Sequence, residues 1–238
     1  MWKDIEIYDF HSHILPAMDD GAKDIKMSLE MLGYLTNQGV DKVLATSHYY
    51  NFNQSVEEFL IKRDESVFKL QTYIKEHDIF TPDIITACEV RLFPDMHKEE
   101  KLDRLCIEGT NKILVEMPYI HWNAWMYNEI YALISKGYEP IVAHIERYAS
   151  LMGAKEIIEK LIRLNVRVQI NSEFIKTRKE RKLVKKLIKL KVPMVLGTDC
   201  HNLEDRKGNI KESLEYLSKK YSDEFIKEIM QNAKDFTN

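Results

Sequence analysis

The feature of this sequence that most constrains its fold is a regular alternation of two apolar patterns along the whole chain. Short runs rich in β-branched residues alternate with longer segments in which apolar residues recur every three or four positions. The first pattern predicts buried strands, and the second predicts helices that pack on them. Because strict alternation produces parallel strands with right-handed crossovers, the sequence predicts an α/β fold, either an open doubly wound sheet or a closed barrel.

Seven strands and several helices can be read from this pattern. No Ser/Gly linker, low-complexity run or internal repeat divides the 238 residues, so we predict a single domain over residues 1–238. Seven strands in one domain favour a (βα)7, TIM-like barrel over an open sheet. Helices are clearest at 154–164 and 181–191, and Ser55 with Glu58 predicts a capping box at the start of another. The predicted strands are 5–10, 43–47, 84–88, 113–115, 141–143, 167–170 and 194–197.

Charge and composition exclude several classes of partner. The 35 Lys and Arg residues are outnumbered by 38 Asp and Glu, which leaves no excess positive charge for nucleic acid. No stretch approaches the roughly 20 apolar residues of a membrane span, and no basic segment followed by an apolar run opens the chain. Three cysteines without framework spacing indicate a reducing compartment. We therefore expect a cytoplasmic protein with no membrane insertion and no nucleic-acid partner.

Residues able to bind metal stand at the end of six of the seven predicted strands. The two histidines 11 and 13 lie two positions apart, so both imidazoles face the same side of an extended strand, and residues 199 and 201 repeat this spacing. In a parallel barrel all these strand ends lie on one rim, where they converge. A single His or Glu at a strand end is more often a hydrogen-bonded rim residue, but eight in register predict a metal centre. They are His11, His13, His48, Glu89, Glu116, His144, Asp199 and His201.

The chemistry of these side chains narrows the choice of metal. Mixed imidazole and carboxylate ligands without cysteine suit Mn, Zn or Fe(II) better than Mg or Ca. Asp19-Asp20-Gly21 adds an acid that a glycine turn can fold back over the rim. Arg147 and Arg206 follow strand ends closely, and a guanidinium suits bidentate phosphate binding.

The candidate residues lie in short motifs that can be compared with known families. These are His11-Ser12-His13, Asp19-Asp20-Gly21, Thr46-Ser47-His48, Ala143-His144-Ile145-Glu146-Arg147 and Asp199-Cys200-His201, together with Glu89 and Glu116. In this order, over nearly the whole chain, they resemble the polymerase-and-histidinol-phosphatase (PHP) superfamily. The resemblance is closest to the bacterial manganese-dependent tyrosine phosphatases of capsule and exopolysaccharide operons. It implies a distorted seven-stranded βα barrel.

The resemblance also implies a centre of three divalent metal ions, Mn²⁺ before Fe²⁺ or Zn²⁺. One ion would be held by His11, His13, Glu89 and Asp199, a second by Glu89, Glu116 and His144, and a third by Asp20, His48 and His201. Arg147 and Arg206 match catalytic, phosphate-binding arginines, and His48 also borders the phosphate. The sequence departs from the usual pattern at Ser47, Cys88, Ile145 and Cys200, which bears on loop shape and substrate fit.

The implied activity is a protein-tyrosine phosphatase in which metal-activated hydroxide attacks a phosphotyrosine of a bacterial tyrosine kinase that controls capsule or exopolysaccharide synthesis. Three alternatives stay open. In one, the same chemistry serves a small substrate such as histidinol phosphate; in another, the metals only support recognition of a phosphorylated partner. Residues 200–206 also satisfy Cys-x5-Arg, the signature of thiolate phosphatases, although Glu204 and Asp205 would repel phosphate. His121 is a further candidate for the border of the substrate site.

Overall fold

The computed structural model describes residues 4–120, 122–151 and 154–238. In this part of the chain, all strand pairs are parallel and belong to two sheets. The first sheet has the order β1-β2-β4 and the second has the order β3-β5-β6-β7-β8-β9. The predicted α/β class with parallel strands is therefore confirmed. The strands are β1 (Tyr8–Ser12), β2 (Lys42–Ala45), β3 (His48–Tyr49), β4 (Asp83–Thr86), β5 (Glu89–Arg91), β6 (Lys112–Glu116), β7 (Glu139–Val142), β8 (Arg167–Asn171) and β9 (Met194–Gly197).

The prediction of seven strands was wrong, because a further short strand follows each of two predicted strands. Predicted strand 43–47 ends at Ala45 as β2, and β3 begins at His48; predicted strand 84–88 ends at Thr86 as β4, and β5 begins at Glu89. At the first break, Thr46 N–H still bonds to the Ser12 carbonyl of β1, while the carbonyls of Thr46 and Ser47 accept from Glu89 N–H. The backbone thus leaves one sheet and enters the other within two residues.

A second junction links the two sheets on their other side. Ser12 forms an isolated parallel bridge with Cys200. Asp199 N–H donates to the His11 carbonyl at 2.7 Å, and His13 N–H donates to the Cys200 carbonyl at 2.9 Å. The structure therefore has two parallel sheets joined by hydrogen bonds on both sides, in place of the single seven-stranded sheet that we predicted.

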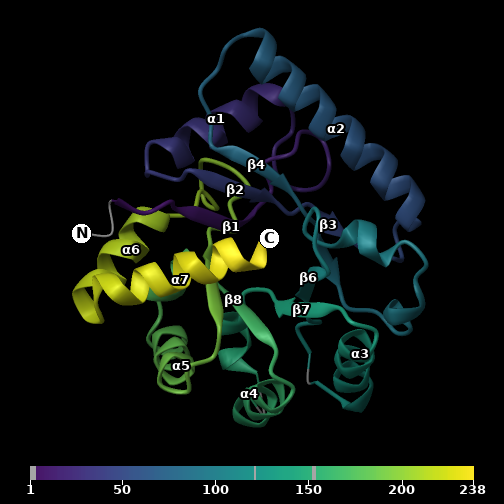
Figure 1. Ribbon diagram of the computed structural model, residues 1–238, viewed down its shortest axis with the longest axis vertical. Coiled ribbons are helices and arrows are strands. Elements are labelled where there is room, and N and C mark those ends of the chain that lie inside the picture. The colour runs from purple at the N-terminus through teal and green to yellow at the C-terminus, as the bar shows by residue number, and fades with distance from the viewer. Residues whose placement is uncertain (1–3, 121, 152–153) are drawn as a thin grey trace.

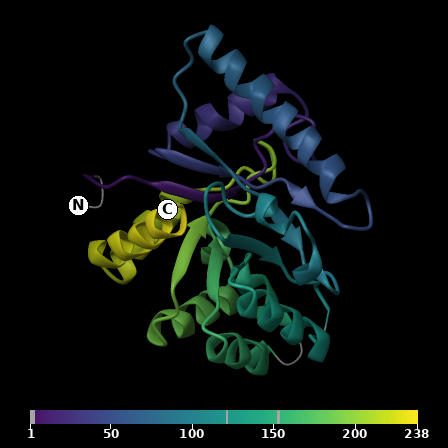
Figure 2. The ribbon, with the colours of Figure 1, turned by 45° about the vertical axis from the view of Figure 1, so that its right-hand side comes forward.

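The helices cover the outer faces of the two sheets. Figures 1 and 2 show α1 (Ile25–Thr36) and α2 (Val56–Glu76) over the three-stranded sheet. On the opposite side, α3 (Ala124–Ser135), α4 (Ala154–Arg163) and α5 (Arg178–Lys189) flank the larger sheet. The predicted capping box is present, since Ser55 and Glu58 exchange hydrogen bonds at the start of α2. No helix in the described ranges is long and apolar enough to cross a membrane.

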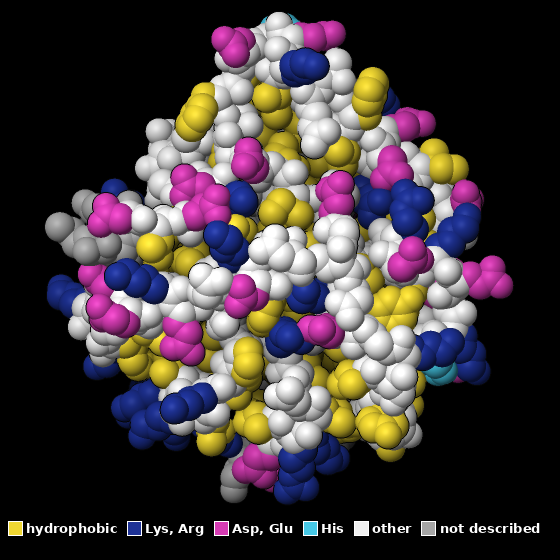
Figure 3. All heavy atoms as spheres, viewed as in Figure 1, with side chains coloured by type: hydrophobic (Ala, Val, Ile, Leu, Met, Phe, Trp, Pro, Cys, Tyr) yellow, Lys and Arg dark blue, Asp and Glu magenta, His cyan; other side chains and the backbone are white. Residues whose placement is uncertain are grey.

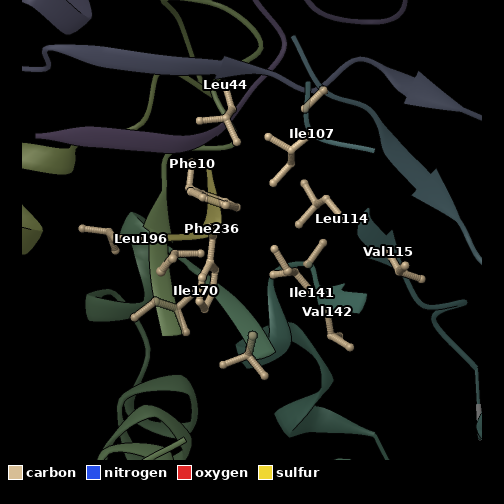
Figure 4. Packing of buried hydrophobic residues seen from close by; sticks show 14 of the residues in the cluster. Phe10, Leu44, Ile107, Leu114, Val115, Ile141, Val142, Ile170, Leu196 and Phe236 are labelled. Atoms are coloured by element: carbon tan, nitrogen blue, oxygen red, sulfur yellow. The ribbon is translucent and has the colours of Figure 1, made fainter. Parts of the chain in front are cut away.

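Figure 4 shows apolar side chains of β1, β2, β6, β7, β8 and β9 packed together in the core. Phe10 of β1 meets Phe236 of α7 (Asp223–Phe236) edge to face, with ring centroids 6.1 Å apart. The helix α6 (Ile210–Lys220) precedes α7, which packs against β1 and β9. Burial of such aromatic side chains contributes about 1.5–3 kcal/mol each. The apolar core leaves the carboxyl ends of the strands to polar side chains.

A candidate metal centre at the strand ends

The structure brings all nine predicted ligands together at the carboxyl ends of the strands. His11 lies near the end of β1 and Glu116 ends β6, while His48 and Glu89 closely follow the carboxyl ends of β2 and β4, where they begin β3 and β5. Eight of the nine residues also occur in three groups whose candidate ligand atoms lie within 4.8 Å of one another. The groups are His11, His13, Glu89 and Asp199; His13, Asp20, His48 and His201; and His48, Glu89 and Glu116.

The first group is fully buried and very compact. Nε2 of His11 lies 3.1 Å from Oε2 of Glu89 and 3.5 Å from Oδ1 of Asp199. Nε2 of His13 lies 3.4 Å and 3.3 Å from the same two oxygens. Two imidazole nitrogens and two carboxylate oxygens thus face one small volume, which suits a single cation with nitrogen and oxygen ligands.

The other candidates surround this group. Nε2 of His144 lies 2.8 Å from Oε1 of Glu89 and 4.0 Å from Oε1 of Glu116. Asp20 approaches the second side, with Oδ1 3.5 Å from Nε2 of His48 and 3.4 Å from Nε2 of His201. Glu89 therefore stands between the groups and is the natural bridging ligand.

Several of these side chains have buried polar atoms without a hydrogen-bond partner. Among the described residues, Oε2 of Glu116, Nδ1 of His48 and Nε2 of His201 form no hydrogen bond, although carboxylate oxygens of Glu89 and Asp20 lie 2.9 Å and 3.4 Å from the two imidazole nitrogens. A buried polar atom without a partner costs about 1–3 kcal/mol. Because these atoms border the ligand groups, metal ions would give them partners, and the donor set fits such ions.

The closely spaced carboxylates of the centre need positive charge beside them. Burial raises the pKa of Glu89, but His11, His13 and His144 outweigh burial and hold this pKa well below its usual value. Burial, and then the charge of Glu89, raise the pKa of Glu116. A group of carboxylates this close together is stable only with protonated histidines or bound cations.

Two ligand positions have a strained backbone. His144 has φ of 31° and Asp199 has φ of 55°, both in the left-handed region that residues other than glycine rarely adopt. His144 follows the end of β7, and Asp199 follows β9. Such strain costs on the order of 1–3 kcal/mol and is concentrated at functional sites. Here it turns each side chain toward the centre at the point where its strand ends.

Three residues that we did not predict hold the ligands in place. Oδ2 of Asp19 accepts from His48 N–H at 2.8 Å and lies 2.8 Å from Nδ1 of His13. Oε1 of Gln169 accepts from His144 N–H and lies 3.1 Å from Nδ1 of His11. Asn171 donates its side-chain amide to Asp199 at 3.1 Å. Gln169 and Asn171 point inward from β8, the strand for which we predicted no metal ligand.

The two predicted phosphate-binding arginines border the ligands. The guanidinium of Arg147, in the short helix η4 (Ile145–Ser150), pairs with Oδ2 of Asp199. Arg206 lies 3.0 Å from Oδ2 of Asp20 and 3.6 Å from Oδ2 of Asp199. Their side chains are 40% and 36% exposed, so both guanidiniums are accessible from solvent.

The thiol of Cys200 is not placed for nucleophilic attack. It is buried and lies 3.6 Å from the carbonyl of Asn202, and burial raises its pKa. A thiolate nucleophile needs the opposite, a lowered pKa and some exposure. The geometry therefore argues against Cys-x5-Arg chemistry. His121 lies outside the described residues.

Another group of potential ligands, Asp95, His97 and Glu129, lies apart from the centre. The Glu129 carboxylate already accepts from the backbone N–H groups of Asp95 and His97 and from the His97 ring. Asp95 pairs with Lys98 at 2.9 Å. We assign this group a structural role in joining α3 to the turn at 95–98.

The fold and the clustered ligands define an α/β protein with a candidate centre for several metal ions at the carboxyl ends of its parallel strands. Within that class, the chain belongs to the CpsB/CapC family of capsular polysaccharide synthesis, which matches residues 7–237.

Characterised relatives extend over almost the same length. The chain is 29% identical over 231 residues to tyrosine-protein phosphatase YwqE of Bacillus subtilis, covering 94% of this chain and 89% of the relative. It is 26% identical over 237 residues to tyrosine-protein phosphatase CpsB of Streptococcus agalactiae serotype III, covering 94% and 96%. A chain from the crystal structures of B. subtilis YwqE and Streptococcus pneumoniae CpsB, described as unique metal-dependent tyrosine phosphatases, superposes with a TM-score of 0.80 at 27% identity, covering 97% and 94%.

Proposed function

We propose that this protein is a metal-dependent protein-tyrosine phosphatase. The observation that carries the proposal is the convergence of nine imidazole and carboxylate side chains beside two solvent-accessible arginines. The activity named for its relatives supports it. Its substrate is a phosphotyrosine of a bacterial tyrosine kinase that controls capsule or exopolysaccharide assembly, and it acts in the cytoplasm.

Three divalent ions, Mn²⁺ in preference to Fe²⁺ or Zn²⁺, complete the proposed centre. The described geometry supports one set on His11, His13, Glu89 and Asp199, one on Asp20, His48 and His201, and one on Glu89, Glu116 and His144. The whole chain acts as one unit, in which the two sheets together form a distorted barrel with the centre on its rim. When bound, the metals supply Lewis acidity and a nucleophilic hydroxide at neutral pH.

The residues of the chain orient and neutralise the phosphate. Arg147 and Arg206 each present a planar fork that matches two phosphate oxygens and neutralises charge as it develops on them. Four proposed carboxylate ligands, Asp20, Glu89, Glu116 and Asp199, oppose six charges of three divalent ions. About two positive charges remain, which match a phosphate dianion.

Aromatic side chains at the edge of the centre suit the phenyl ring of phosphotyrosine. The rings of His48 and Tyr50 stack with centroids 5.0 Å apart, and Tyr50 stacks on Phe52 at 5.5 Å with nearly parallel planes. Phe52 is 70% exposed. This column leads from a ligand to solvent and offers stacking surface to a planar leaving group.

The deciding experiment measures turnover of a phosphotyrosine peptide, histidinol phosphate and nucleotides by the wild type, His144→Ala and Arg206→Ala, before and after chelation. We expect preference for phosphotyrosine, loss on chelation, rescue by Mn²⁺, and a loss of about 10²-fold or more in each variant. Preference for histidinol phosphate would replace the substrate assignment and keep the metal chemistry. Tight metal binding without hydrolysis of any ester would indicate a recognition module.

A further inference from the structure

The helix α5 concentrates positive charge on a protein that is acidic overall. Its twelve residues, Arg178–Lys189, contain seven Lys or Arg and one Glu, whereas the whole chain has a net charge of −3. Figure 3 shows Lys and Arg side chains gathered along the lower edge of the molecule, over α4 and α5. A charge concentration of this kind attracts polyanions over a distance of about one Debye length, roughly 10 Å at 0.1 M salt.

Within the described part of the chain, ion pairs leave most of these positive charges without an acidic partner. Of the α5 lysines, Lys186 alone has such a pair there, with Glu159 of α4 at 3.8 Å. Lys179, Lys182, Lys185 and Lys189 are exposed. Of the apolar residues of the helix, Leu183, Val184 and Leu187 are buried, and Ile188 is partly buried against the core. The helix therefore presents charge to solvent and has no apolar face left to insert into a bilayer.

A hollow of about 700 Å³ lies beside these lysines. Its floor is formed by Ala149, Ile158 and Leu183, and its walls are lysines of α5. A hollow with an apolar floor and a basic wall receives the side chains of a bound peptide, whereas a flat lipid surface would leave it unfilled. The apolar floor and the surrounding lysines together favour a protein segment that carries acidic residues.

The hollow begins next to the candidate metal centre. Ala149 is two residues beyond Arg147 in η4, and α5 packs against η4. Since α5 follows β8 and the short helix η5 (Ser172–Ile175), its first turn lies at the carboxyl end of the sheet. From Lys179 to Lys189 the helix rises about 15 Å, which an extended peptide spans in about five residues.

We propose that the α5 groove, formed by Ala149, Ile158, Lys179, Lys182, Leu183, Lys185, Lys186 and Lys189, docks an acidic segment adjacent to the phosphotyrosine of the protein substrate. This inference rests on the proposed phosphatase function and deepens it. Docking in the α5 groove favours protein substrates over free phosphotyrosine, because only a peptide can reach the metal centre and the α5 groove at the same time. It also raises the encounter rate of acidic substrates.

The test compares Lys179→Glu/Lys182→Glu/Lys189→Glu with a control of equal charge change, Lys219→Glu/Lys220→Glu/Lys227→Glu, on exposed positions of α6 and α7. The substrates are phosphotyrosine, a neutral phosphotyrosine peptide, and peptides with about five acidic residues before or after the phosphotyrosine. At low salt we expect one acidic peptide to have a kcat/KM about tenfold above the neutral peptide. The α5 variant loses this advantage, the control keeps it, and all three proteins hydrolyse free phosphotyrosine equally.

A second readout separates docking from catalysis. Fluorescence anisotropy of the labelled acidic peptides without phosphate measures docking even if no ester is hydrolysed, so failure of the phosphatase assignment is distinguishable from failure of docking. Weaker binding to the α5 variant alone supports the proposal. Equal binding to all three proteins overturns it. Retention on phosphatidylglycerol vesicles that only the α5 variant loses, with unchanged peptide binding, assigns the surface to lipid and also overturns it.

Discussion

Substitution of Asp19 by Asn tests whether the centre depends on residues that touch no metal. The Asp19 side chain is 6% exposed, and its carboxylate accepts from Gly21 N–H and His48 N–H while contacting Nδ1 of His13. Burial raises the pKa of Asp19, but His13 and the hydrogen bonds outweigh burial and lower it, so the group is ionised at neutral pH. An Asn amide has only one oxygen to accept hydrogen bonds. Its NH2 group would face one of the N–H donors that now bond to the Asp19 carboxylate.

The expected loss follows from these contacts. A hydrogen bond to a charged group contributes about 1.5–3 kcal/mol, and 1.4 kcal/mol corresponds to a tenfold change in an equilibrium constant. We therefore expect Asp19→Asn to bind Mn²⁺ roughly 10- to 100-fold more weakly, as is usual when a residue orienting a metal ligand is removed. Turnover at saturating metal should fall less than metal affinity does.

The assay is competition for Mn²⁺ against a fluorescent chelator, with thermal unfolding of the metal-free protein measured in parallel. Asp24→Asn is the matched control, because Asp24 caps α1 by accepting from Met27 N–H and Asn caps helices about as well. Wild-type metal affinity in Asp19→Asn would refute the role of Asp19 in orienting His13. A loss that appears equally in the control would show that the assay reports loop stability.

Three further outcomes are expected. Gly197→Ala should lower the free energy of unfolding by about 1–3 kcal/mol in urea titrations, because its Cβ would lie 2.6 Å from Cβ of His11. Gly33→Ala, in α1 with nothing within 4 Å, should instead raise the free energy of unfolding by up to about 1 kcal/mol, because Ala favours a helix more than Gly does. Burial lowers the pKa of His13, but Asp19 and other carboxylates raise it well above its usual value in the metal-free protein. Metal binding must then displace protons, so chelator competition should show higher affinity at pH 8 than at pH 6, and equal affinities would contradict this linkage. Cys200→Ser should keep turnover of phosphotyrosine within about twofold, since a buried thiol with a raised pKa is a poor nucleophile; loss of turnover with full metal content would restore the thiolate mechanism.

The fold class followed from the sequence because burial of strands and helices leaves a periodic apolar pattern. The number of strands did not follow from the sequence. Thr46 and Ser47 separate β2 from β3, but this segment has no Gly or Pro that would mark a break. Their backbone bonds to Ser12 and Glu89 are tertiary contacts between segments far apart in the chain. Such contacts end β2 at Ala45 and place β3 in the other sheet, and they leave no local trace in the sequence.

Candidate ligands were easier to find than the residues that hold them. His11 and His13 attract notice because an imidazole at the end of an apolar strand is unusual. Gln169 looks like an ordinary polar residue of a strand, and its role depends on facing inward between His11 and His144. Only the alternation of β8 could have indicated this, since Gln169 and Asn171 lie two apart on one face.

The hydrogen bonds between His11, His13 and residues 199–200 mean that the centre is built from opposite ends of the chain. During synthesis on a ribosome, His11 and His13 emerge long before Asp199 and His201, so two of the nine candidate ligands are absent until residues 199–201 have been made. Hydrolytic activity can therefore appear only after nearly the entire polypeptide has left the exit tunnel.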